Sequence, residues 1–73
     1  MARIDVVSEI AGKVWKISAD PGTALEEEDD VLILESMKME IPVPAPAAGK
    51  LVELLVREGD DVAEGQAVAV IEG

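Results

Sequence analysis

The sequence predicts an all-β domain in which two similar sheets close over one aliphatic core. Two observations support this prediction. Apolar residues alternate in short runs between turns that contain glycine or proline, and no segment shows a sustained apolar period near 3.6. The second half of the chain also repeats the first. A duplicated set of short strands implies two similar sheets that are related by a pseudo-twofold axis.

The composition indicates one small domain, residues 1–73. The chain contains no cysteine and a single aromatic residue, Trp15, so its core is expected to consist of Val, Ile, Leu and Ala without disulfides. Sixteen acidic and six basic side chains give a net charge of −10, which opposes binding to nucleic-acid phosphates. No apolar run approaches the roughly 20 residues of a membrane helix, and no secretory signal is visible. We therefore expect a cytoplasmic protein that binds neither nucleic acid nor membranes and is a monomer when isolated.

The first two strands are expected at residues 3–8 and 14–19. The first shows a weak apolar alternation. In the second, alternation places Trp15, Ile17 and Ala19 on one face and the polar residues on the other.

The segment after the second strand contains a turn, an acidic run and a third strand. Residues 20–23 read Asp-Pro-Gly-Thr, in which proline presets φ and glycine accepts a positive φ. Residues 26–30 are all acidic, and the apolar strand at residues 31–34 follows. The acidic run lacks the alternating ligands and central glycine of a calcium loop, so we interpret it as a solvated charge run.

The internal repeat aligns residues 11–36 with residues 48–73 at a shift of 37 positions. Seven of the aligned pairs are identical, among them Gly22 with Gly59. Glycines that recur at expected turns indicate backbone conformations that a Cβ would oppose. The repeat also places the chain ends at the position equivalent to residues 36–38. Those residues and the termini are therefore expected at opposite ends of the molecule.

One pair in the repeat departs from this pattern, because Glu28 aligns with Gly65. If the two turns are equivalent, Glu28 has a positive φ that a Cβ disfavours.

The proline-rich segment at residues 41–46 has two interpretations, a semi-rigid linker or an edge strand. Its prolines occupy every second position, so in an extended chain they remove amide donors from one edge only. The segment also lies inside the repeat, with no domain on either side that needs a tether. We therefore predict an edge strand whose prolines prevent unwanted pairing.

A polar hexapeptide lies between two strand-like runs near the middle of the chain and is predicted to form a hairpin turn. Its residues are Glu35, Ser36, Met37, Lys38, Met39 and Glu40. The chain has no His, Cys or Tyr that could form a catalytic constellation with Lys38, and its serines lack a base. Lys38 is either an ordinary surface lysine or a lysine that another protein modifies. Two methionines at a turn suit recognition by another protein's pocket, which favours modification.

The hexapeptide and the following Ile41-Pro42-Val43 resemble the biotinyl-lysine motif of the biotin carboxyl carrier and biotin/lipoyl-attachment family. The resemblance covers nearly the whole chain, including the Gly22 and Gly59 turns. It implies a flattened β-barrel of two four-stranded antiparallel sheets, with the modified lysine on a hairpin opposite the termini.

The resemblance also implies a non-catalytic carrier without a metal site. Lys38 would be the site of covalent biotin attachment, and Met37 and Met39 would be recognised by a biotin protein ligase. The hairpin around the site would comprise Glu35, Ser36 and Glu40. The implied partners are the ligase, a biotin carboxylase and a carboxyltransferase that acts on an acyl-CoA. Lipoate attachment, for acyl or aminomethyl transfer, is the alternative, although lipoyl members usually have an acidic residue and no methionine beside the lysine.

Two features depart from parts of the family. Glu28 stands where a glycine is usual, and the inserted thumb of some bacterial carriers is missing. The chain is therefore most similar to small free-standing attachment proteins or to an excised carboxylase domain. Its Met1 lies only a few residues before the first strand, which favours a stand-alone protein.

Overall fold

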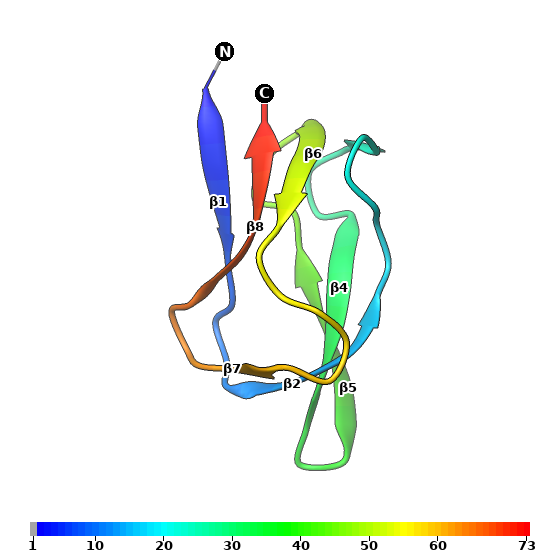
Figure 1. Cartoon of the computed structure of the whole chain (residues 1–73), viewed down its shortest axis with the longest axis vertical. Helices are drawn as coiled ribbons and strands as arrows, with labels where there is room; N and C mark the ends of the chain where they lie inside the picture. The colour runs from blue at the N-terminus through cyan, green and yellow to red at the C-terminus, as the bar shows by residue number, and fades with distance from the viewer. Residues whose placement is uncertain (1) are drawn as a thin grey trace.

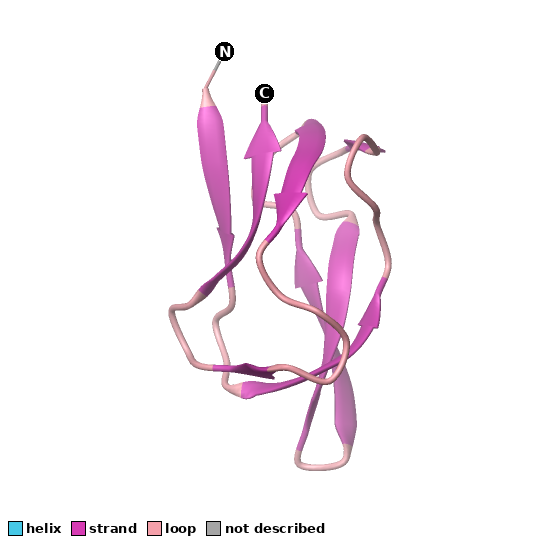
Figure 2. Cartoon of the chain, in the orientation of Figure 1, coloured by secondary structure: helices cyan, strands magenta, loops and turns pink. Residues whose placement is uncertain are grey.

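The computed structural model describes residues 2–73, which form eight β-strands in two four-stranded antiparallel sheets (Figures 1 and 2). The strand orders are β1-β8-β6-β3 and β5-β4-β2-β7. Within residues 2–73 no helix is long and apolar enough to span a membrane. The strands are β1 (Arg3–Val7), β2 (Gly12–Ile17), β3 (Ala24–Leu25), β4 (Asp30–Ser36), β5 (Met39–Pro44), β6 (Gly49–Leu54), β7 (Asp61–Val62) and β8 (Ala67–Glu72).

The internal repeat determines how the two sheets are built. A shift of 37 residues converts β1 into β5, β2 into β6, β3 into β7 and β4 into β8. The strand order of one sheet therefore becomes the order of the other, and each sheet takes two strands from each half of the chain. The prediction of two similar sheets and a flattened β-barrel is confirmed.

Hydrogen bonds at the turns repeat with the same shift. The amide of Gly22 donates to the carbonyl of Leu51 at 2.6 Å, and the amide of Gly59 donates to the carbonyl of Val14 at 2.8 Å. Both glycines have a positive φ, 98° and 94°. The prediction that these recurring glycines mark turns with a left-handed backbone is confirmed.

The core is aliphatic, as predicted, and both sheets contribute to it. Burial of the apolar side chains is the main source of stability, because the chain has no cysteine that could form a disulfide. The largest fully buried apolar side chains are Leu32, Leu34, Leu51, Ile71, Val6, Val14, Val31 and Val68.

The predicted facing of β2 is wrong at Trp15. The pairing of β2 with β4 shifts register between Val14 and Lys16, which is a β-bulge. The bulge interrupts the alternation, so Val14 is buried while Trp15 is 47% exposed. Ala19 is buried but lies beyond the end of the strand. An equivalent register shift occurs in β6 between Leu51 and Glu53, so the bulge belongs to the repeated fold.

Strand β5 is an edge strand, which confirms the interpretation of the proline-rich segment. Pro42 pairs with Ile33 and Pro44 pairs with Asp30, both in β4. No strand within residues 2–73 pairs with the other side of β5, where missing amides leave no donor unsatisfied.

The turn at Glu28 adopts the conformation expected from its repeat partner. Glu28 has a φ of 73° and Gly65 a φ of 84°. The amide of Glu28 donates to Ala45 at 2.9 Å, and that of Gly65 donates to Ser8 at 2.8 Å. The two turns are therefore equivalent, and Glu28 has a left-handed conformation that disfavours a side chain.

We expect the substitution Glu28→Gly to stabilise the fold. Relief of the left-handed strain is worth on the order of 1 kcal/mol, partly offset by the entropy of glycine in the unfolded chain. Thermal melts at high salt, where charge repulsion is screened, should place Glu28→Gly above the charge-matched control Glu28→Gln. Equal melting temperatures for the two variants would contradict the strain at Glu28. Gly65→Ala should lower the melting temperature, because the same turn then acquires a Cβ.

Candidate functional site

The candidate site is the tip of the hairpin that joins β4 and β5. The two strands pair from Asp30 with Pro44 to Ser36 with Met39, which leaves a loop of only two residues, Met37 and Lys38. The hairpin extends from one end of the elongated molecule, and both termini lie at the other end (Figure 1). The predicted separation of Lys38 from the termini is confirmed.

Both loop residues have a left-handed backbone. The φ values are 52° at Met37 and 65° at Lys38. Positive φ at both central residues is the requirement of a type I′ turn, whose twist matches that of the flanking strands. Asparagine and glycine usually occupy such turns, and other residues adopt this conformation at a cost of order 1 kcal/mol or more each. The paired strands therefore hold Met37 and Lys38 in a strained conformation.

The hairpin exposes its lysine and both flanking methionines. Met37 is 92% exposed and Met39 is 63% exposed, and Lys38 between them is also exposed. None of the side-chain hydrogen bonds within residues 2–73 involves Lys38. The lysine amine is thus free to be acylated, and two apolar side chains beside it are free to enter another protein's pocket.

The other predicted site residues lie in the strands below the turn. Glu35 pairs directly with Glu40, and like charges in opposite positions of an antiparallel pair repel each other. Lys13 of the neighbouring strand β2 is the register partner of Glu35 on the other side, which places a basic residue next to the acidic pair. Ser36, partly buried, pairs with Met39 at the last position before the turn. These residues build the hairpin, and none forms a catalytic pair with Lys38.

These residues fit a covalently attached group. An amide-linked carboxylic acid needs an accessible primary amine, and the rigid turn presents the Lys38 amine beyond the body of the domain. Within the described part of the chain, no group of three or more acidic side chains is arranged to hold a metal ion. The geometry is that of a presented lysine.

The left-handed backbone of Met37 and Lys38 was not predicted from the sequence. The usual signal for a type I′ turn is Asn-Gly or Asp-Gly, and Met-Lys gives no such signal. The available signal was the length of the loop, since two-residue hairpins favour primed turns.

Comparisons with known proteins agree with this geometry. Residues 2–71 match the family model described as biotin-requiring enzyme. The chain is 46% identical over 57 residues to a biotin/lipoyl attachment protein of Bacillus subtilis, with 78% of each chain covered. It is 42% identical over 67 residues to urea amidolyase of Saccharomyces cerevisiae, of which it spans only 4%.

A solved structure shows the same fold. The urea carboxylase of Kluyveromyces lactis matches with a TM-score of 0.93 at 39% identity, over 99% of this chain and 6% of that one. Because the family model covers nearly the whole chain, and the Bacillus relative has a similar extent, the family is established. Biotin is the cofactor that this family requires. The chain belongs to the biotin/lipoyl-attachment family of carrier domains found in biotin-dependent carboxylases.

Proposed function

We propose that this chain is a biotin carboxyl carrier that is biotinylated on Lys38. The observation that best supports the proposal is the exposure of Lys38 at a two-residue turn, between two exposed methionines, on the hairpin farthest from the termini. A biotin protein ligase would bind the side chains of Met37 and Met39. The amine of Lys38 would then attack the activated carboxyl carbon of biotinyl-adenylate. An amide forms, and AMP and a proton leave.

The loaded domain then acts as a shuttle and supplies no catalytic residue of its own. Biotin bound at Lys38 would supply a ureido group. A biotin carboxylase would attach a carboxyl group to it, with ATP and bicarbonate, and a carboxyltransferase would transfer that carboxyl group to the acceptor. The strained, tightly paired hairpin fixes the attachment point, so the motion of the arm is confined to its flexible bonds. Tethering raises the effective concentration of the carboxyl group at both active sites, which is the physical advantage of a carrier.

We propose an acyl-CoA as the carboxyl acceptor, and the cytoplasm as the location. The similarity to urea amidolyase and urea carboxylase favours urea as a second candidate acceptor. Lipoate on Lys38 is the alternative cofactor, since the family includes both attachments. The methionine flanks favour biotin over lipoate.

The modification can be tested with the unloaded protein, ATP and either biotin with a biotin ligase or lipoate with a lipoate ligase. Intact mass spectrometry should show addition of one biotinyl group and little lipoyl addition. A chain that accepts lipoate but no biotin would disprove the proposed cofactor.

The substitution Met37→Asp should slow biotinylation about tenfold with the fold intact, because it places a charge where the ligase contacts an apolar side chain. Lipoylation should improve. Leu55→Asp is a matched control, since Leu55 is an exposed apolar residue outside the hairpin. This variant should be biotinylated at the normal rate. Unchanged kcat/KM for both Met37→Asp and Met39→Ala would show that the ligase does not read the methionines.

A further inference from the structure

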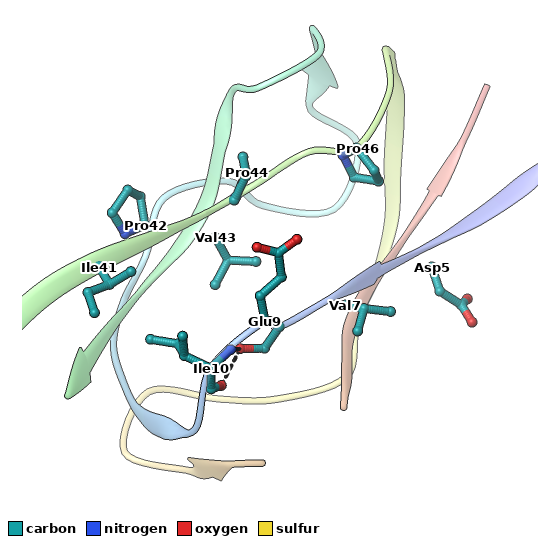
Figure 3. Close-up of a pocket in the computed structure, with 10 residues that line it drawn as sticks. Asp5, Val7, Glu9, Ile10, Ile41, Pro42, Val43, Pro44 and Pro46 are labelled. Carbon is teal, nitrogen blue, oxygen red and sulfur yellow. Dashed lines mark hydrogen bonds between the residues drawn. The ribbon is translucent and has the colours of Figure 1, made fainter. Parts of the chain in front are cut away.

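A groove lies between the edge strands of the two sheets, β1 and β5 (Figure 3). Its volume is about 360 Å³. We call it the β1–β5 groove, and it is lined by Asp5, Val7, Ser8, Glu9, Ile10, Ile41, Pro42, Val43, Pro44 and Pro46.

The two walls of the groove are related by the internal repeat, but their chemistry differs. One wall presents Asp5, Val7 and Glu9. In the internal repeat, these three positions align with the prolines of the other wall, Pro42, Pro44 and Pro46. All six residues are exposed, and Val7 is 44% exposed. Asp5, Val7 and Glu9 therefore line one side of the groove and the prolines line the other, and the side chain of Glu9 points toward the prolines (Figure 3).

Only one wall can accept another strand. β1 pairs with β8 on one side, and no strand within residues 2–73 pairs with its other side. The first wall has no proline, so its edge retains amide donors, whereas β5 lacks the amides of Pro42 and Pro44. An extended segment can therefore add to the free edge of β1.

The geometry points to a partner segment in which a basic, an apolar and a basic residue occupy alternate positions. In a strand added to β1, residues two apart project to the same face and reach Asp5 and Val7 in turn, while Glu9 lies in the bend two residues after the end of β1. The basic side chains then meet the two carboxylates, while the apolar one packs on Val7 and the prolines. No lysine or arginine lines the groove, so its carboxylates have no cation of their own there.

A second copy of this chain does not fit the groove. Two copies with a net charge of −10 repel each other, and the chain contains no pair of basic residues four positions apart. The occupant we propose is a segment of another protein. Lys38 is not among the residues that line the groove, so the groove could hold the carrier to a partner while Lys38 is modified.

The probe is a heptapeptide in which lysine, valine and lysine alternate with threonine, titrated into the isotopically labelled protein at low salt. Chemical shifts should move mainly along β1 and β5, with weak affinity that falls as salt is added. A peptide of the same composition with its lysines three apart should bind at least fivefold more weakly. Equal binding of both peptides, or no binding at millimolar concentration, would overturn the proposal.

Charge reversal tests the wall directly. The double variant Asp5→Lys with Glu9→Lys should lose at least tenfold in affinity for the heptapeptide. The control Asp20→Lys with Glu53→Lys makes the same change in net charge at exposed positions outside the groove and should lose much less. Equal losses of affinity for the two double variants would mean that the peptide is attracted to the acidic surface as a whole. That result would refute binding in the groove. The groove does not depend on the modification of Lys38, so Lys38→Arg should bind the peptide normally.

Discussion

Replacing Lys38 by arginine should abolish biotinylation completely while the fold is retained. The guanidinium keeps the charge and the approximate length of the side chain, but unlike the lysine amine it does not lose its proton to become a nucleophile, so no amide forms. Streptavidin blots and intact mass spectrometry after reaction with a biotin ligase measure the loss. Lys13→Arg and Lys50→Arg are matched controls, because both lysines are exposed and belong to paired strands; both should load normally.

A second substitution separates loss of the acceptor from loss of the fold. Lys38 has a φ of 65°, which glycine adopts without strain, so Lys38→Gly should be at least as stable as the parent protein in thermal melts. It should nevertheless take up no biotin. Streptavidin binding by either Lys38 variant would refute Lys38 as the attachment site.

The substitution Gly49→Ala should cause a large loss of stability. A Cβ at Gly49 would lie 2.5 Å from Cγ2 of Ile71 and 2.7 Å from the carbonyl oxygen of Glu72. The side chain of Ile71 can shift, but the backbone of β8 is paired on both sides and cannot move easily. We expect a cost of about 2–3 kcal/mol, which lowers the melting temperature by roughly 10–20 °C.

The repeat provides a matched control for this prediction. Gly12 is the equivalent of Gly49, but a Cβ there would lie 3.0 Å from the carbonyl oxygen of Glu35 and 3.4 Å or more from its other neighbours. Gly12→Ala should therefore cost clearly less than Gly49→Ala. Equal melting temperatures for the two variants would show that β8 relaxes around the added methyl group.

The sequence alone determined the strands, the turns and the presented lysine. Alternation of apolar residues, glycines in register and prolines at every second position are local signals, and each reflects a conformational preference of one residue and its neighbours. The repeat extended these signals to long range, because it related Glu28 to Gly65 and the termini to the hairpin. The Met37-Lys38-Met39 cluster indicated a site of modification because apolar side chains at an exposed turn have no structural use there.

The tertiary structure alone decided what depends on pairing between distant strands. Sequence could not show that each sheet combines strands from both halves, because alternation is the same whichever partner a strand has. For the same reason the bulge that exposes Trp15 was missed, since it arises from the pairing of β2 with β4. The left-handed backbone of Met37 and Lys38 follows from the twist of the paired strands, and the β1–β5 groove follows from two edges that meet only in the folded domain.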